Sequence, residues 1–584
     1  MSAAQGPAYD VGVVGLGPTG LTLAHLLATR GLSVLVLERE PAFYGMARAV
    51  YTDDECLRIL QTAGVADDVH ADMMVDLPVQ WLRADRSVLT QFRTTARPQG
   101  WPVSNFLYQP FFENTLERRL AEHPSVTVRR GRAVVGFDQD ADGVTVHHVH
   151  SAGTAYGRDE ETAPASPIDG ALDGAVDGTG APESTRISYL VAADGGRSGV
   201  RASLGIEMEG RSFPQRWLVI DLKAKDGVDA FGHLPYFDFV CDPELPTVSC
   251  PQPDNRHRFE FMLSDDDESE EFERLETARR LMSGYVDVDD VEIDRQLVYT
   301  FNALVAKEWR RGRVFLAGDA AHMTPQFIGQ GMNAGLRDAD NLSWKLADVN
   351  RRGAADSLLD SYQSERQPHA TAMINLSVLN KDIVSTGSPL GIRARDLGIG
   401  LAARTPGVRS FLTEAKVKPK PRYRHGSYVG LPRRLGGTRG VEGTLMPQVP
   451  VRTQAGRPVR LDDALGAGWV VLGVEIDPRG ALAAGPWEQL GATWAVLYQP
   501  GARPQGGHLP RPRTAGDQAH GSETPLVDLE AVDDELSCWL AKAGAARGSV
   551  IVLRPDKYVF SVTRPGDHET AVRELTRQVG VASS

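Results

Sequence analysis

Short apolar runs alternate with a helical pattern at the start of the chain. Residues Val11–Val14 form an apolar run that predicts a buried parallel strand, and Ser33–Glu38 predicts a second strand. An amphipathic helix is expected between them, over about Leu21–Arg30. Strand, helix and strand in this order indicate an α/β fold built on a Rossmann-like sheet.

A different pattern follows further along the chain. Residues 210–300 alternate apolar and polar positions, as in Trp217–Leu222 and Arg256–Met262, which predicts an antiparallel sheet. A β-hairpin is expected over Val134–His150, and a charged helix over Asp265–Ser283. Near the C-terminus, apolar runs at 469–474, 494–498 and 550–553 predict a final α/β segment.

Residues of about 152–184 fit neither pattern. They are small, acidic and rich in glycine and proline, so they offer too little apolar surface to bury a core. We expect a mobile acidic loop here. A loop that binds a partner is the alternative.

Three glycines follow the first strand directly. Gly15 suits the tight turn, Gly17 lets the backbone approach a pyrophosphate, and Gly20 lets helix and strand pack closely. Glu38 ends the second strand, where a carboxylate accepts hydrogen bonds from a ribose 2′-hydroxyl. The alternative is a chance pattern in an ordinary strand–helix turn. The motif predicts a dinucleotide without a 2′-phosphate and leaves FAD and NAD both open.

Two further segments place a carboxylate after a strand. Asp319 follows the apolar strand 313–318, at the strand end where ligands lie in open α/β sheets. Asp194 ends the strand at 189–193. Taken alone, Asp319 suits a helix N-cap and Asp194 an ordinary turn residue. His322 is expected to be a packing or loop histidine, with no chemical role.

These segments, in this order, resemble the class A flavoprotein monooxygenases, the p-hydroxybenzoate hydroxylase family, over residues of about 8–380. The 3-(3-hydroxyphenyl)propionate hydroxylase type and the polyketide aromatic hydroxylases are most similar. Further matching text lies at 48–49, 53–55, 108–110, 335–346 and 362–369. The resemblance implies an FAD site, in which Asp319 holds the ribityl chain and Asp194 serves both FAD and NAD(P)H. The residues that it assigns to cofactor binding are Gly15, Gly17, Thr19, Gly20, Glu38, Arg39, Arg48, Gln109, Asp194, Asp319, Pro325, Gly329, Gly331, Met332 and Asn333.

The resemblance also implies a reaction. NADH or NADPH reduces FAD, O₂ then gives a C4a-hydroperoxyflavin, and one oxygen passes to a phenolic or polycyclic aromatic substrate. Epoxidation or Baeyer–Villiger oxygenation is the alternative, and a non-catalytic flavin-binding scaffold is a second one. No residue is assigned as the base that activates the phenol. His233, Tyr236, Phe237, Phe239 and Arg256 could line the substrate pocket, although a core position on a sheet face explains each of them better.

The patterns and the resemblance together predict the domain organisation. The FAD-binding domain comprises 1–75, 101–209 and 301–380, and an inserted antiparallel-sheet substrate domain comprises 76–100 and 210–300. A helical and loop linker covers 381–435. Residues 436–584 resemble the thioredoxin-like C-terminal domain of larger family members, without a C-x-x-C motif for redox work.

Composition narrows the remaining classes. The net charge of −13 argues against a nucleic-acid partner, and no apolar run reaches the ~18 residues of a membrane helix. The four cysteines are scattered and suit free thiols in a reducing compartment, and no signal peptide is recognised, so a cytoplasmic location is expected. No His/Cys cluster has metal-ligand spacing. The expected partners are a small aromatic substrate and O₂, and a homodimer is possible.

Overall fold

The computed structural model has a mixed α/β fold. It describes residues 7–43, 45, 47–153, 182–264, 269–272, 274–405, 418–428, 440–480, 482, 485–504, 525–564 and 568–580. Most of the acidic loop expected at about 152–184 lies outside these residues.

The first sheet contains the predicted strand–helix–strand unit. Its strands lie in the order β17-β18-β11-β1-β2-β8, and β9 and β10 extend it from β11. The central pairs of β1 with β11 and with β2 are parallel, as predicted. The bounds are β1 Tyr9–Val14, β2 Val34–Glu38, β8 Val126–Arg130, β9 Arg132–Gln139, β10 Val144–His150, β11 Glu183–Ala192, β17 Arg310–Arg311 and β18 Val314–Leu316.

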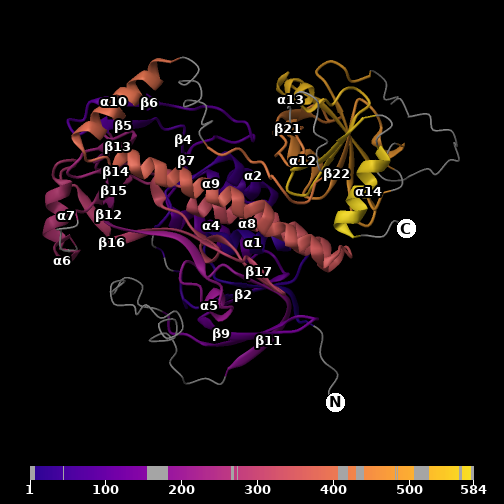
Figure 1. The fold of residues 1–584 in the computed structure, drawn as a ribbon, viewed down its shortest axis with the longest axis horizontal. Helices are drawn as coiled ribbons and strands as arrows, with labels where there is room; N and C mark the ends of the chain where they lie inside the picture. The colour runs from indigo at the N-terminus through magenta and orange to yellow at the C-terminus, as the bar shows by residue number, and fades with distance from the viewer. Residues whose placement is uncertain are drawn as a thin grey trace.

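Helices from distant parts of the chain pack with this sheet. The helix α1 contacts both α4 and α8, and α8 in turn contacts α9, so the two long helices lie side by side across the middle of the molecule (Figure 1). Their apolar residues join the strands in one core. The bounds are α1 Pro18–Thr29, α2 Asp54–Thr62, α3 Ala66–His70, α4 Gln109–Leu120, α5 Gly199–Ser203, α8 Gly331–Arg351, α9 Ser361–Val384 and α10 Pro389–Arg404.

The second sheet holds the alternating segment. Its order is β19-β16-β12-β15-β14-β13-β5-β6, and its pairs are antiparallel except that of β5 with β13, which is parallel. Of the helix expected at 265–283, the described residues show two pieces, α6 Ser269–Phe272 and α7 Leu275–Met282, and residues 265–268 and 273 lie outside the described residues. The strand bounds are β5 Val79–Arg83, β6 Val88–Phe92, β12 Met208–Ala224, β13 Phe237–Cys241, β14 Thr247–Gln252, β15 Arg256–Met262, β16 Val291–Ala306 and β19 His322–Met323.

The two faces of this second sheet pack differently. Leu218, Ile220 and Leu222 of β12 point to a core that includes residues of α7. Trp217 of the same strand points the other way, into a cluster with Phe327 of the loop before α8. Because side chains alternate along a strand, every second residue of β12, β15 and β16 faces the first sheet's helices and loops. We call this the inner face of the second sheet.

The third sheet lies at the far end of the molecule, drawn in orange and yellow in Figure 1. Its order is β21-β20-β24-β23-β22-β25-β26, with β22, β23 and β24 parallel. The predicted strands at 469–474, 494–498 and 550–553 are all present. The bounds are β20 Pro450–Arg452, β21 Pro458–Arg460, β22 Val470–Val474, β23 Thr493–Tyr498, β24 Leu526–Ala531, β25 Val550–Leu553, β26 Val559–Thr563, α12 Leu461–Leu465, α13 Glu535–Ala543 and α14 His568–Val579.

A small fourth group of strands forms a separate sheet in the order β3 Tyr51–Thr52, β7 Asn105–Phe106 and β4 Met74–Val75. All four cysteines are free thiols. Among the described residues, no helix combines the length and the apolar character needed to cross a membrane.

Candidate functional site

The glycine-rich turn after β1 has the geometry that its sequence predicts. Gly15 has φ +100°, and a Cβ there would lie 2.4 Å from the carbonyl oxygen of Ala193. A Cβ on Gly20 would lie 2.0 Å from the Gly15 carbonyl oxygen, so strand and helix approach as closely as expected. Around Gly17, by contrast, no atom lies within 4 Å of the Cβ position. The turn is therefore tight on its protein side and open at Gly17, as a pyrophosphate requires.

Glu38 lies at the end of β2 beside this turn. Its Oε2 accepts a hydrogen bond from the Leu16 N–H at 2.7 Å, and its Oε1 accepts one from the Glu40 N–H at 2.9 Å. The carboxylate thus orders the turn, and each oxygen keeps further lone pairs for a ribose hydroxyl. The neighbouring Arg39 forms an ion pair with Glu40 at 3.5 Å.

Gln109, the first residue of α4, fixes the segment around Arg48. The Gln109 Oε1 atom accepts from the backbone N–H groups of Arg48 and Ala49 at 2.8 and 2.5 Å. Its amide nitrogen donates to Glu113 at 2.8 Å. Burial raises the pKa of Glu113 to about 7. Gln109 therefore holds the backbone at Arg48, whose side chain is exposed.

Asp194 lies where β11 ends, next to the glycine turn. The position of a Gly15 Cβ would be 3.2 Å from the Asp194 Cα. The Asp194 Oδ2 atom accepts from the Val200 N–H at 3.3 Å, whereas Oδ1 is enclosed and has no hydrogen-bond partner among the described residues. Burial raises the pKa of the Asp194 carboxyl. An enclosed carboxylate oxygen without a partner is suited to a ligand hydroxyl or amide.

Asp319 projects from a short turn of 3₁₀ helix, Gly318–Ala320, that buried residues hold in place. Gly318 has φ +59°, and its N–H donates to Asp338 of α8 at 3.1 Å. Asp319 itself is exposed, yet desolvation by the surrounding protein raises the pKa of its carboxyl. The carboxylate is therefore accessible to a ligand although protein atoms surround it. The helix N-cap reading of Asp319 is wrong, since Ala317 occupies the cap and no side chain bonds there.

His322 takes part in packing, as the sequence suggested. It is fully buried, and its Nε2 lies 2.6 Å from the Asp338 Oδ2. The other Asp338 oxygen accepts from Arg366 Nε at 2.9 Å. This buried group anchors the turn that presents Asp319.

The segment from Pro325 to Asn333 runs from a buried proline into the start of α8. Gly329 has φ +61°, which favours glycine, and a Cβ there would lie 2.9 Å from Tyr51. Gly331 and Met332 begin the helix, and the first N–H groups of a helix have no partner within it. These N–H groups can bind an electronegative ligand edge. The Asn333 side chain bonds inward, to Gly329 O at 2.7 Å and to Thr52 at 2.8 Å, so only its backbone serves a ligand.

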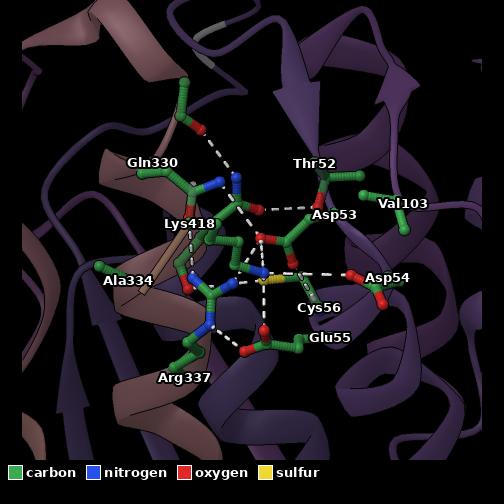
Figure 2. Close-up of polar contacts among 12 residues, drawn as sticks. Thr52, Asp53, Asp54, Glu55, Cys56, Val103, Gln330, Ala334, Arg337 and Lys418 are labelled. Carbon is green, nitrogen blue, oxygen red and sulfur yellow. Dashed lines mark hydrogen bonds and ion pairs between the residues drawn. The ribbon is translucent and has the colours of Figure 1, made fainter. Parts of the chain in front are cut away.

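A buried cluster of charges holds this helix start against α2 (Figure 2). The Lys418 Nζ atom lies 2.8 Å from Asp53 Oδ2 and 2.6 Å from Glu55 Oε1. Arg337 of α8 bonds to both carboxylates and donates to Gln330 Oε1 at 3.0 Å. Gln330 is the N-cap residue of α8. The cluster therefore ties the helix start to α2 and to the chain at 418.

The carboxylates of this cluster differ in the direction of their pKa shifts. Burial alone would raise the pKa of Asp53 and of Glu55, but Arg337 and Lys418 outweigh it and lower both. For Asp54, burial dominates and raises the pKa to about 7, since Lys418 is 4.0 Å away.

The three marker segments come together in the structure. A Cβ on Gly318 would lie 2.6 Å from the Thr19 hydroxyl oxygen, and one on Gly335 would lie 2.2 Å from the same atom. The start of α1, the Asp319 turn and the start of α8 are thus immediate neighbours, and Asp194 adjoins the glycine turn. Within the described ranges, no cluster of three or more His, Cys, Asp or Glu side chains is arranged to hold a metal ion.

Comparison with known proteins identifies the family. Residues 8–162 and 170–377 match the family model described as FAD binding domain, and residues 443–578 match the model described as HcaD C-terminal domain. The chain is 35% identical over 558 residues to the 3-(3-hydroxy-phenyl)propionate/3-hydroxycinnamic acid hydroxylase of Burkholderia cenocepacia, covering 95% of this chain and 94% of that protein. The chain belongs to the FAD-dependent aromatic monooxygenases.

Further proteins are similar to this chain in sequence or in fold. A hydroxylase of the same name from Mycobacterium avium is 35% identical, over 94% of this chain and 88% of that protein. Aklavinone-11 hydroxylase, solved with FAD and aklavinone, is 23% identical with a TM-score of 0.71, over 99% of this chain and 100% of that chain. The flavin-dependent monooxygenase PieE, with FAD and substrate, is 21% identical with a TM-score of 0.75, over 98% and 100%. These two structures show the fold.

FAD is the cofactor of this monooxygenase, and the structure fits it. The open position at Gly17, the unpartnered Asp194 oxygen and the accessible Asp319 carboxylate are the features that a bound dinucleotide would complete.

The candidate substrate residues are spread over the second sheet. Phe239 is buried on the inner face, stacked on Trp81 with ring centroids 5.0 Å apart, and Phe237 packs beside it at 4.9 Å. Tyr236 is half-buried just before β13. His233 is exposed and bonds to the Tyr285 carbonyl at 2.7 Å, beside the core of α7, so it lies away from the others.

Arg256 lines a cavity of about 220 Å³ with Gly45, Ala47, Tyr108, Asp221, Asp294 and Arg295. Its guanidinium lies over the Tyr108 ring at 4.2 Å and forms an ion pair with Asp294. Next to this cavity, Arg258 and Arg295 both donate to the Ala47 carbonyl oxygen, at 2.8 and 2.5 Å. These two hydrogen bonds fix the segment that precedes Arg48 to the second sheet.

Sequence reasoning missed the residues that fix these positions. Asp53 and Arg337 are 284 positions apart, and no local pattern pairs them. Glu260, Gln326 and Tyr299, which meet between the second sheet and the segment 325–333, were missed for a related reason. Glu260 and Tyr299 sit in ordinary strand alternation, and a glutamine carries no distinctive signal.

Proposed function

We propose that this FAD-dependent monooxygenase hydroxylates a phenol with a short carboxylate side chain, using O₂ and either NADH or NADPH. The relatives that match at 35% identity are named for 3-(3-hydroxyphenyl)propionate and 3-hydroxycinnamate, which supports this substrate class. When bound and reduced, FAD supplies the activated oxygen atom.

One observation carries the proposal. The inner face of the second sheet meets the flavin loop 325–333 through aromatic rings: Phe327 lies 5.0 Å from Trp217 and 5.4 Å from Phe301, between ring centroids. These rings are buried and form an apolar aromatic wall beside the start of α8, which would back a site for a flat ring and keep water from the reacting atoms.

The residues of this chain have separate roles in the proposal. Glu38 and the glycine turn would hold the adenosine and pyrophosphate, and Asp319 the ribityl chain. The N–H groups at the start of α8 would stabilise negative charge on the reduced flavin. The aromatic wall would orient the substrate ring.

The test is a panel containing 3-(3-hydroxyphenyl)propionate, 3-hydroxycinnamate, a nitrophenol, a polycyclic phenol and a quinone. We expect a phenol to stimulate oxidation of NADH or NADPH and to gain one oxygen atom from isotope-labelled O₂. A new oxygen that derives from water would contradict the proposal. Ring expansion or an epoxide would favour the Baeyer–Villiger or epoxidation alternative, and bound FAD that neither nicotinamide reduces would favour a non-catalytic scaffold. His233→Ala serves as the control, since that residue lies away from the site.

We also propose the domain organisation predicted from the sequence, with residues 436–584 as a thioredoxin-like domain that serves packing or dimer contact. The parallel strands β22–β24, extended by antiparallel β25 and β26, support a thioredoxin-like arrangement. Cys538 is the single cysteine of this segment, so a dithiol role is not proposed. A cytoplasmic location and a homodimer stay predictions, and sedimentation of the purified protein would check the second.

A further inference from the structure

The inner face of the second sheet carries a buried carboxyl group that the sequence did not single out. Glu260 of β15 pairs in register with Val219 of β12, and it is 5% exposed. Tyr299 of β16 lies nearby on the same face, opposite Trp217 of β12. Both side chains therefore point toward the flavin loop rather than toward α7.

Gln326 of the flavin loop connects these two side chains. Its Nε2 donates to Glu260 Oε2, and its Oε1 accepts from the Tyr299 hydroxyl. Gln326 lies in the same short segment as Gly329 and Gly331, which lead into the start of α8. The second Glu260 oxygen, Oε1, has no hydrogen-bond partner among the described residues, and it is not enclosed. An accessible carboxylate oxygen thus lies between the sheet and the flavin loop.

The charged neighbours leave Glu260 without a cation of its own. Arg258 on the same strand forms a bidentate pair with Asp221 of β12, at 2.6 and 2.8 Å, and donates its remaining nitrogen to Arg48 O at 2.5 Å. Burial raises the pKa of Glu260 to about 7, a rise that Arg258 opposes and Asp221 supports. A carboxyl group with such a pKa changes protonation near neutral pH, as a general base should.

Tyr299 does not offer the same chemistry. Burial raises the pKa of its hydroxyl well above the ordinary value, so it stays protonated and donates to Gln326. Its role is to hold Gln326, and through Gln326 the carboxyl group of Glu260.

We propose that Glu260 is the catalytic residue that accepts the proton of the substrate phenol, with Gln326 and Tyr299 as positioning residues. The phenol O–H bond breaks, the proton moves to Glu260 Oε1, and the electron pair stays on the phenol oxygen. The electron-rich ring carbon then forms its bond to the oxygen that the flavin supplies, while the O–O bond that carried this oxygen breaks and its electron pair leaves with the second oxygen, which is released as water. The same ring carbon then releases its hydrogen as a proton to solvent, the C–H electron pair restores the aromatic ring, and the Glu260 proton returns to the product's original oxygen. This inference rests on the proposed phenol hydroxylation.

The experiment compares wild type with Glu260→Gln, which keeps the size of the side chain and an acceptor for Gln326. The probe is the phenol with the highest wild-type turnover in the panel above. We expect kcat to fall about 10²-fold or more, within the range that general-base catalysis contributes. In wild type kcat should rise with pH through about 7, and the variant should lose this rise.

A binding measurement on oxidised holoenzyme separates a base from a structural residue. The ultraviolet difference spectrum of the bound phenol reports its ionisation, which should occur at lower pH in wild type than in Glu260→Gln. Glu260→Asp keeps a carboxylate and should restore part of kcat. Asp238→Asn is the matched control: this buried carboxyl of β13, whose pKa burial raises to about 6, lies on the opposite face, and the variant should keep wild-type kcat.

The outcomes separate the two proposals. If no phenol of the panel is turned over by wild type, the proposed function fails and this inference fails with it. If wild type hydroxylates a phenol while Glu260→Gln shows the same kcat, pH profile and phenol ionisation, only this inference is overturned. A loss of FAD from Glu260→Gln would also overturn it under three further conditions. These are that Glu260→Asp restores none of kcat, that Asp238→Asn keeps wild-type kcat, and that the pH of phenol ionisation does not change.

Discussion

Arg554, directly after β25, and Glu365 of α9 form a fully buried bidentate ion pair. The Nη1–Oε1 and Nη2–Oε2 distances are 2.7 and 2.9 Å. Lys345 of α8 lies 2.9 Å from the same carboxylate. This group joins the C-terminal segment to the two long helices, and Arg58 of α2 adds a second buried link to Asp462 at 2.6 Å.

The first prediction concerns stability at low pH. Burial alone would raise the pKa of Glu365, but Arg554 and Lys345 outweigh it and lower the pKa to about 2 from 4.5. The pair therefore stabilises the fold fully above about pH 4.5, and its contribution of ~3 kcal/mol is lost as the pH falls toward 2. Urea unfolding at a series of pH values should show this loss in wild type.

Glu365→Gln should cost ~3–5 kcal/mol at neutral pH, because it leaves Arg554 buried with less compensating charge. Glu574→Gln is the control, since the Glu574–Arg577 pair lies at the surface and contributes at most ~1 kcal/mol. Equal stability of the two variants would show that the buried pair does not hold the C-terminal segment to the helices α8 and α9.

The second prediction concerns Lys418. Replacing it with Met leaves Asp53 and Glu55 less compensated, so Arg337 and Gln330 should lose their fixed places at the start of α8. Anionic reduced flavin should then be less stabilised. We expect a midpoint potential lower by roughly 20 mV, equivalent to about 1 kcal/mol, and weaker FAD binding.

Lys418→Arg should restore most of the potential, because it keeps the charge. Lys420→Met is the matched control, as Lys420 is exposed two residues away. A Lys418→Met protein that is less stable but has an unchanged potential would limit the cluster to a structural role.

The third prediction is that Asp319→Ala weakens FAD binding at least ~10-fold, equivalent to 1.4 kcal/mol, while the chain still folds. Because Asp319 makes no cap hydrogen bond, the flavin-free protein should lose less than ~0.5 kcal/mol of stability, as for an ordinary surface substitution. Fluorescence titration with FAD and thermal unfolding of the flavin-free form measure the two effects. Unchanged FAD affinity would show that Asp319 does not contribute to the cofactor site.

The sequence predicted those features whose physical cause is local. The glycine turn, the hairpin of β9 and β10 and the strands of the third sheet follow from backbone freedom and from side-chain alternation within a few residues. The expected helix at 265–283 proved to be two short helices, since a run of charged residues gives no apolar face long enough to hold one helix to the sheet.

Features that depend on distant residues were not predictable in this way. The parallel pairing of β5 with β13 joins segments about 160 residues apart, and neither strand's pattern specifies its neighbour. Asp53, Glu55 and Arg337 lay in text that matched the family, but the role of each depends on Lys418. Gln326 gains its role only because folding sets it between Glu260 and Tyr299.

The last prediction concerns the acidic segment between β10 and β11. These strands pair as neighbours, and the register sets His148 opposite Glu183. His148 and Glu183 therefore lie next to each other across the sheet, five residues before Gly153 and one residue after Pro182, so a short connection suffices to join the two strands. Replacing residues 155–180 with a short Gly-Ser bridge should leave the flavin content and the turnover near wild type.

A shorter loop between ends that are already adjacent should also cost little or no stability, because closure entropy varies slowly with loop length. The measurements are the FAD-to-protein absorbance ratio, the substrate-stimulated oxidation of nicotinamide and the urea midpoint. Shortening the hairpin loop at 140–143 to two residues is the matched control. The Asp140 side chain accepts a hydrogen bond from the Gly143 N–H there, and the loss of this bond should lower the urea midpoint. If the long deletion lowers the flavin content while the control does not, the acidic segment contributes to the cofactor site or binds a partner that supports it.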